Sequence, residues 1–256
     1  MRLSLYVPGD TWVHRLDPMT KLLMTVVGIG LTFLLPSLQG GTLLLVLLLA
    51  VLGSAGVLHR AAAVYAGVAI VAGTFLVVQG LVYPGNAVPA LTLGPIVFYR
   101  EGLLVGLRLA LRLYNILSAT LILVLVTHPS DLVEAVVRRG ASPRLGYVIM
   151  AVLQVIPTMM ATASTIMDAQ RSRGLETEGS LWVRLKAFVP VMGPLVTGSL
   201  IATEERALAL EVRGFSGEGR PTFLKEEVIP PYATAARLVT VAALAAGIAG
   251  RWLLGW

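Results

Sequence analysis

The amino-acid sequence predicts an all-α integral membrane protein with about five transmembrane helices and additional long amphipathic helices. Hydrophobic residues make up 56% of the 256 residues, and charged residues only 13%, well below the roughly 25% of a soluble domain. No Asp, Glu, Lys or Arg occurs between Leu22 and Leu58 or between Ala61 and Tyr99. Each of these stretches can hold helices of the ~20 residues that cross a bilayer. Charged residues instead recur in clusters from Asp131 to Glu227.

Turn-forming residues divide the uncharged stretches, notably Pro36 and Pro84. We therefore expect membrane spans at 21–37, 41–58, 61–82, 102–127 and 233–256. The fourth span carries Arg108 and Arg112, whose spacing places them on one helix face. These arginines either anchor to lipid headgroups or contact a partner subunit.

Two more apolar runs, 145–167 and 187–203, lie between the charged clusters. Proline interrupts both runs, at Pro157, Pro190 and Pro194, which argues against clean membrane spans. We expect long amphipathic helices at the boundary between membrane and cytoplasm instead. The sequence thus predicts three regions: a transmembrane region at 1–130, a charged cytoplasmic region at 131–230 and a C-terminal transmembrane helix at 231–256.

Basic residues set the expected orientation. Arg2, Arg15 and Lys21 precede the first span, and the charged region follows the fourth. Basic residues are enriched on the cytoplasmic side of membrane proteins. An even number of spans separates the two segments, so we expect both in the cytoplasm.

A seven-residue pattern, Ala-x-x-x-Arg-Gly-apolar, occurs at Ala169–Leu175 and again at Ala209–Phe215. Each copy is typical of a helix C-terminus, with Gly in the left-handed cap and Arg at the negative end of the helix dipole. The repetition suggests a further role, in which both helix ends face the cytoplasm side by side. Each arginine would then pair with a carboxylate of a partner protein, and the apolar residue would fill a groove beside it.

Other motifs favour structural roles. Asp17 before Pro18 predicts a helix N-cap with Pro at the first helical position, with Arg15 or Lys21 as an ion partner. Pro157 and Gly193 are either flexible points of long helices or static kinks and packing contacts.

Composition and motifs argue against an enzyme. The chain has no Cys, and His14, His59 and His128 are scattered. Zinc-protease, nucleophile-elbow and phosphate-loop motifs are absent from the sequence, so we expect no catalytic residue and no resident metal or cofactor. The net charge of +6 is typical of cytoplasmic loops rather than of nucleic-acid binding. A secondary transporter, or another polytopic membrane protein, is the alternative, although the spans lack the mid-membrane acidic groups that such carriers use.

Over nearly its whole length the chain resembles the transmembrane (T) components of energy-coupling factor transporters. The resemblance is carried by the paired Arg-Gly ends and by the stretches His14–Leu22, Leu153–Pro157 and Asp168–Gly174. It implies a subunit that joins two cytoplasmic ABC-type ATPases to a small membrane protein, the S component, which captures a vitamin or metal ion. It also implies a prokaryotic plasma membrane and a coupling role for region 131–230.

The resemblance further assigns roles to individual residues. Docking on the ATPases would involve Ser172, Arg173, Gly174, Leu175, Val212, Arg213, Gly214 and Phe215, and Arg15, Asp17, Pro18 and Lys21 would form the N-terminal motif. ATP and Mg²⁺ would bind the partner ATPases and not this chain. The stretch 145–180 is similar to T components dedicated to a thiamine precursor, hydroxymethylpyrimidine, while cobalt, nickel, biotin or a shared system stay open.

Overall fold

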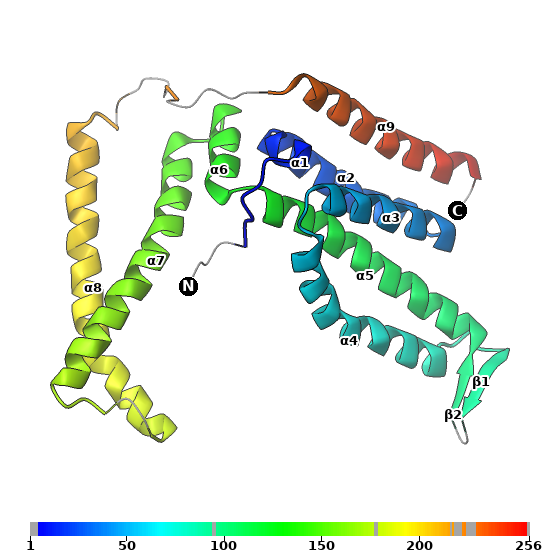
Figure 1. Cartoon of the computed structure of the whole chain (residues 1–256), viewed down its shortest axis with the longest axis horizontal. Coiled ribbons are helices and arrows are strands. Elements are labelled where there is room, and N and C mark those ends of the chain that lie inside the picture. The colour runs from blue at the N-terminus through cyan, green and yellow to red at the C-terminus, as the bar shows by residue number, and fades with distance from the viewer. Residues whose placement is uncertain are drawn as a thin grey trace. The chain divides into compact units, whose positions relative to one another are not determined.

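A computed structural model describes residues 5–93, 96–176, 179–215, 217, 222–223 and 229–254. Its elements are α1 (Trp12–Arg15), α2 (Pro18–Leu34), α3 (Leu38–Ser54), α4 (Leu58–Val82), β1 (Pro89–Leu93), β2 (Ile96–Tyr99), α5 (Arg100–Val126), α6 (Pro129–Arg138), α7 (Pro143–Ser172), α8 (Leu181–Val212) and α9 (Pro231–Leu254) (Figure 1). The chain divides into two compact units, Met1–Val136 with Glu226–Trp256, and Val137–Lys225.

The first unit is built around α5, which packs against α2, α3 and α4. Two glycines of α5 allow α4 to approach closely. A Cβ atom at Gly102 would lie 2.0 Å from the carbonyl oxygen of Gln79, and one at Gly106 would lie 2.8 Å from that of Phe75. Small residues at this spacing are typical of tightly packed membrane helices.

Apolar side chains from the helices α1 to α5 form the core of this unit. Its buried members include Val27 of α2, Leu48 of α3, and Ala119 and Leu125 of α5. Helix α9 lies along α2 (Figure 1), where a Cβ at Gly247 would lie only 2.7 Å from the Leu31 side chain. The C-terminal helix is therefore an integral part of the first unit, although 220 residues separate Asp17 from its contact in α9.

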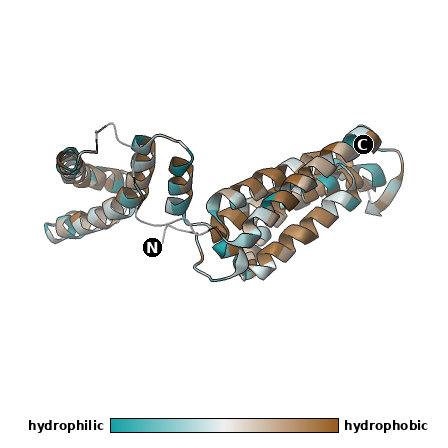
Figure 2. Cartoon of the chain, turned by 90° about the horizontal axis from the view of Figure 1, so that it is seen from above, coloured by the Kyte–Doolittle hydropathy of each residue, from teal (hydrophilic) through white to brown (hydrophobic). Residues whose placement is uncertain are grey.

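Five described helices are long and apolar enough to cross a membrane, namely α4, α5, α7, α8 and α9. Helices α2 and α3 have 17 residues each, about 25 Å at ~1.5 Å per residue, which is shorter than a hydrocarbon core of ~30 Å. In Figure 2 the helices of the first unit are brown, and thus hydrophobic, along most of their length. These findings confirm an all-α multi-pass membrane protein.

The connection between α4 and α5 contains an element that the sequence did not predict. Strands β1 and β2 pair antiparallel where only a loop was expected. The Glu101 carboxylate accepts hydrogen bonds from the backbone N–H groups of Ala87 and Val88, at 3.3 and 3.1 Å. The first turn of α5 thereby fixes the start of the hairpin.

The second unit consists mainly of α7 and α8, which run in opposite directions (Figure 1). Both helices continue through their prolines, Pro157 in α7 and Pro190 and Pro194 in α8. The prolines therefore do not end these helices, which agrees with the prediction of long helices in this region. Apolar residues of α8 are spread around the helix and do not form the single stripe of an amphipathic helix.

Candidate functional site

The first Arg-Gly motif forms the C-terminal cap of α7. Gly174 has a φ of +88°, in the left-handed region that favours glycine. The N–H of Leu175 donates to the carbonyl of Gln170 at 3.0 Å, and the N–H of Gly174 donates to that of Arg171 at 2.9 Å. This pair of bonds defines a Schellman motif, with Arg173 at the C-cap position.

The second motif repeats this geometry at the end of α8. Gly214 has a φ of +75°, and Arg213 occupies the C-cap. The N–H of Phe215 donates to the carbonyl of Leu210 at 3.0 Å, and the N–H of Gly214 donates to that of Glu211 at 2.9 Å. The helix-cap interpretation is therefore confirmed at both ends, and the two Schellman bonds correspond in the two copies.

The caps direct two arginines outward. Arg173 and Arg213 are both exposed, and within the described ranges neither makes an ion pair or a side-chain hydrogen bond. By contrast, Arg171 lies 3.6 Å from the carboxylate of Asp168 on the same helix. The cap arginines are thus available to a partner, whereas a neighbouring arginine is held within its own helix.

The hypothesis that the two ends lie side by side is wrong for this structure. The ring of Phe215, next to the second cap, lies 5.3 Å from the ring of Tyr147 in the first turns of α7. The first cap lies at the other end of the same helix. The helix between Tyr147 and Arg173 is about 40 Å long at ~1.5 Å per residue, so the antiparallel packing separates the caps by about that distance.

The apolar residues after the caps differ in exposure. Leu175 is half-buried, whereas Phe215 is 37% exposed although it packs on Tyr147. Ser172 and Val212, which precede the cap arginines, are exposed, Val212 to 89%. The surface around each arginine is therefore open. Their role in docking stays a prediction.

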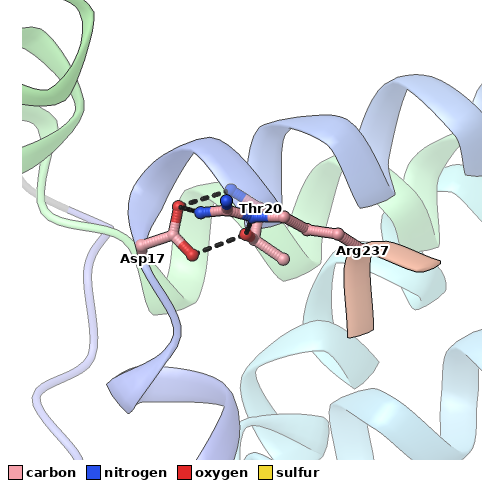
Figure 3. Close-up of polar contacts among 3 residues, drawn as sticks. All are labelled: Asp17, Thr20 and Arg237. Atoms are coloured by element: carbon pink, nitrogen blue, oxygen red, sulfur yellow. Dashed lines mark hydrogen bonds and ion pairs between the residues drawn. The ribbon is translucent and has the colours of Figure 1, made fainter. Parts of the chain in front are cut away.

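The N-terminal motif forms a different structure, a polar cluster inside the first unit (Figure 3). Asp17 caps α2 and accepts a hydrogen bond from the backbone N–H of Thr20 at 3.1 Å, and another from the Thr20 hydroxyl. Arg237 of α9 donates from Nη2 to Asp17 at 2.8 Å and from Nε to the Thr20 hydroxyl at 2.6 Å. This bidentate contact joins α2 to α9.

Burial and hydrogen bonding act in opposite directions on Asp17. Burial alone raises the pKa of the carboxyl, but the hydrogen bonds from Thr20 and Arg237 and the guanidinium charge outweigh burial and lower the pKa below its ordinary value. The Asp17 side chain is only 1% exposed. The carboxylate is therefore a buried anion that depends on its donors.

Lys21 attaches the same cluster to α5. Its Nζ donates to the carbonyl of His14 at 2.9 Å and to that of Val126, the last residue of α5, at 3.2 Å. An ammonium at a helix C-terminus satisfies a carbonyl that has no partner within the helix. Lys21 is 3% exposed, so this contact lies in the interior.

His14 fixes the chain before the cluster. Its Nε2 lies 3.0 Å from the carbonyl oxygen of Val7, and its Nδ1 lies 2.7 Å from the Thr11 hydroxyl. Because a carbonyl can only accept, the contacts assign the proton to Nε2 and make Nδ1 the acceptor. Burial lowers the pKa of His14, which agrees with this neutral form. The N–H of Val7 in turn donates to the carbonyl of Leu125 at 2.9 Å.

We call Asp17, Thr20, Lys21 and Arg237 the clasp. The predicted N-cap at Asp17 with Pro18 at N1 is confirmed. Arg15 is exposed and pairs with no carboxylate in the part of the chain described. Sequence reasoning missed Arg237, although an arginine inside an apolar span signals a need for a buried partner, and Asp17 is an acidic residue at the edge of a span.

The two proposed hinge positions, Pro157 and Gly193, are exposed, whereas most clasp residues are buried. A Cβ at Gly193 would meet no atom within 4 Å, so no packing contact in this unit requires glycine there. A role as a flexible point stays a prediction. No group of three or more His, Cys, Asp or Glu among the described residues could hold a metal ion.

Comparison with known proteins identifies the family. The profile of the cobalt transport protein family, CbiQ, matches residues 9–223. The chain is 36% identical to the energy-coupling factor transporter transmembrane protein EcfT of Bacillus selenitireducens, covering 88% of this chain and 90% of the relative. It is 35% identical to EcfT of Heliobacterium modesticaldum (85% of each chain) and 32% identical to EcfT of Lacticaseibacillus paracasei (84% and 85%). The chain therefore belongs to the CbiQ/EcfT family and is the transmembrane T component of an energy-coupling factor transporter.

Proposed function

We propose that this chain is the mechanical link between two cytoplasmic ABC-type ATPases and a small membrane S component that captures a vitamin or a metal ion. The single observation that supports this link is the matched pair of exposed arginine caps on α7 and α8. Two identical caps suit two ATPase subunits of one fold. The proposal leaves the chain itself without a catalytic residue, and ATP and Mg²⁺ would bind the ATPases.

The chemistry of docking follows from the caps. A guanidinium presents several donors in a planar fork that matches a carboxylate. Arg173 and Arg213 lie at the carbonyl end of their helices, where backbone carbonyls repel an anion and favour the cation. A carboxylate in a groove of each ATPase would therefore approach the arginine and not the backbone, and Leu175 or Phe215 would fill apolar space beside it.

The spacing of the caps suggests how movement is transmitted. ATP binding would bring the two ATPases together, and each ATPase would carry one cap with it. Because the caps lie at opposite ends of an antiparallel helix pair, convergence of the ATPases would change the angle between α7 and α8. Nucleotide must bind one arrangement more tightly than the other for this shift to occur. The S component would sense the change through apolar faces of these helices.

Topology and cargo complete the proposal. The chain would lie in the plasma membrane of a prokaryote, with its N-terminus and region 131–230 in the cytoplasm. The S component would choose the cargo. The family description names cobalt transport, whereas the stretch 145–180 favours a thiamine precursor, and a shared system with several S components is equally compatible with the chain.

Co-purification of the detergent-solubilised complex tests the proposal. The wild type is compared with Arg173→Glu/Arg213→Glu, and with Arg184→Glu/Arg206→Glu as a control of equal charge change on exposed positions of α8. We expect the wild type and the control to retain both ATPases. The cap variant should lose them, since a Glu would face the partner carboxylate and weaken binding by about 100-fold or more per site.

Two results would contradict the proposal. A wild type that binds no ATPase rules out the link. A correctly folded cap variant that still binds both ATPases shows that the arginines act only as helix caps. Size-exclusion profiles and thermal unfolding of each variant in detergent establish that folding is unchanged.

A further inference from the structure

A cavity of about 200 Å³ lies between the turn that joins α2 to α3 and the adjoining face of α5. Arg108 and Arg112 line it from α5, and Ser37 and Gly41 line it from the turn and from α3. Most other lining residues are apolar, and no Asp or Glu lines this cavity. The cavity therefore combines positive charge with an apolar wall.

Positive charge gathers at this end of the first unit. Arg112 lies over the ring of Phe33, with its guanidinium carbon 4.9 Å from the ring centre. Arg251 of α9 donates to the backbone carbonyl of Phe33 at 3.3 Å. Within the described ranges, neither these arginines nor Arg108 forms an ion pair with a carboxylate. Three guanidinium groups thus gather around one turn without a compensating anion.

A buried amide lies beside the cavity. The side chain of Asn115 is 1% exposed, and its Nδ2 donates to the carbonyl of Gly41 at 3.0 Å. That bond fixes the orientation of the amide. The carbonyl oxygen Oδ1 is buried and has no hydrogen-bond partner among the described residues. A buried acceptor without a donor is uncommon in folded proteins. Because Oδ1 is inaccessible although the cavity is open, it does not face the cavity, and the amide serves to join α5 to α3.

The position of the cavity favours a lipid. Helices α2 and α3 have 17 residues and α5 has 27, so the α2–α3 turn meets α5 at Arg108–Asn115, well inside the helix. An arginine at such a position needs an anion or a route to the headgroups. Ser37 caps α3 there, accepting from the N–H of Gly40 at 3.1 Å, which adds the positive end of a helix dipole.

We propose that this cavity binds the headgroup of an anionic phospholipid, such as phosphatidylglycerol. The phosphate oxygens accept from Arg108 and Arg112. The apolar wall accommodates the glycerol backbone and the start of the acyl chains, which distinguishes a lipid from free phosphate. The lipid thereby fixes the α2–α3 turn against α5.

Native mass spectrometry of the full chain, titrated with dioleoyl phosphatidylglycerol or dioleoyl phosphatidylcholine, tests the site. Arg108→Gln/Arg112→Gln removes both charges, and Arg60→Gln/Arg100→Gln removes two exposed charges of the same unit that lie outside the cavity. We expect the wild type and the control to bind phosphatidylglycerol more tightly than phosphatidylcholine. The cavity variant should lose this preference, with its apparent affinity for phosphatidylglycerol lower by about 10- to 100-fold.

Arg108→Lys/Arg112→Lys keeps the charge and removes the bidentate geometry, so we expect an intermediate loss of affinity. If the Gln variant does not fold, the Lys variant tests in its place whether the two arginines bind the lipid. Equal binding of the two lipids by the wild type, or an unchanged lipid preference in a folded cavity variant, overturns the proposal.

Two other outcomes identify a different ligand and also overturn it. Displacement of phosphatidylglycerol by an equal concentration of inorganic phosphate would assign the cavity to free phosphate. Loss of the small membrane partner from the complex, with lipid binding unchanged, would show that Arg108 and Arg112 contact protein. Loss of ATPases is not expected from any of these variants, so failure here is separate from failure of arginine docking.

Discussion

The two units of this chain use their charged residues in opposite ways. In the first unit, Asp17, Lys21 and Arg237 point inward and join helices that are far apart in sequence. In the second unit, Arg173 and Arg213 are exposed at helix ends, and their side chains make no hydrogen bond or ion pair in the part of the chain described. The first arrangement stabilises the unit that contains it, whereas the second leaves binding capacity for another protein.

The apolar residues follow the same division. The first unit has a buried core, whereas the described part of the second unit buries only Gly146, Ala187 and Val191. Large apolar side chains are exposed along α7 and α8, for example Leu145 at 64% and Leu208 at 63%. Exposed apolar surface of this extent is typical of a binding or membrane surface. The first unit is thus held by its own contacts, and the second depends on lipid or partners.

The largest effect on stability is expected from Lys21. Lys21→Met removes both hydrogen bonds from a buried ammonium and leaves the carbonyls of His14 and Val126 without that donor. Each charged hydrogen bond contributes about 1.5–3 kcal/mol, so we expect a loss of about 3 kcal/mol. Thermal unfolding in detergent, followed by tryptophan fluorescence, measures it. Lys186→Met on exposed α8 is the control and should change stability by less than about 0.5 kcal/mol.

A double-mutant cycle on Asp17 and Arg237 measures the contact between α2 and α9. Arg237→Gln removes the guanidinium that pairs with the buried Asp17 carboxylate, which costs about 2–3 kcal/mol. Asp17→Asn should cost less, because the amide still accepts from the Thr20 N–H. We expect a coupling energy of about 1–2 kcal/mol. A coupling near zero would show that the contact does not hold the helices together.

The same pair predicts a dependence on pH. Because the pKa of Asp17 is lowered in the folded chain, its contribution to stability is complete above the ordinary pKa of about 3.9. That contribution is lost as the pH falls through the lowered value, since the unfolded chain then binds the proton more readily. Unfolding measured from pH 6 to pH 3 should show a smaller loss of stability in Asp17→Asn than in the wild type. An identical slope in both proteins would exclude this role for Asp17.

The smallest effects separate cap glycines from helix glycines in the second unit. Gly214→Ala places a Cβ at a φ of +75° and should destabilise the end of α8 by about 1 kcal/mol. Gly193→Ala lies in the helix interior with free space around it and should stabilise α8 by about 0.5–1 kcal/mol. Hydrogen exchange of backbone amides along α8 measures both changes in local stability. If Gly193→Ala also lowers transport without affecting ATPase binding, the position is a flexible point and not merely a static one.

Local patterns allowed much of the fold to be predicted. Uncharged length located the helices of the first unit, since α4, for instance, begins at Leu58 and ends at Val82, against an expected span of 61–82. The two caps were recognisable because a Schellman motif depends on glycine and its immediate neighbours. The N-cap at Asp17 was predictable for the same reason.

Contacts between distant segments could not be predicted in this way. Arg237 lies 220 residues from Asp17, and no spacing rule connects them. The relative direction of α7 and α8 is likewise a property of tertiary packing, seen in the contact between Phe215 and Tyr147, and the caps therefore lie apart and not together. The hairpin of β1 and β2 was missed because its strands are only five and four residues long, too short for a clear alternating pattern.

The clasp has a consequence for how the protein is made. Asp17 and Thr20 leave the ribosome early, whereas Arg237 is synthesised 220 residues after Asp17, about 10–40 s later at ~5–20 residues per second. Throughout that interval the Asp17 carboxylate lacks the Arg237 guanidinium that it pairs with in the folded chain. The first unit therefore completes its packing only after the second has been translated. In a chain truncated before α9, the face of α2 that packs on α9 stays exposed, and quality-control proteases can recognise it.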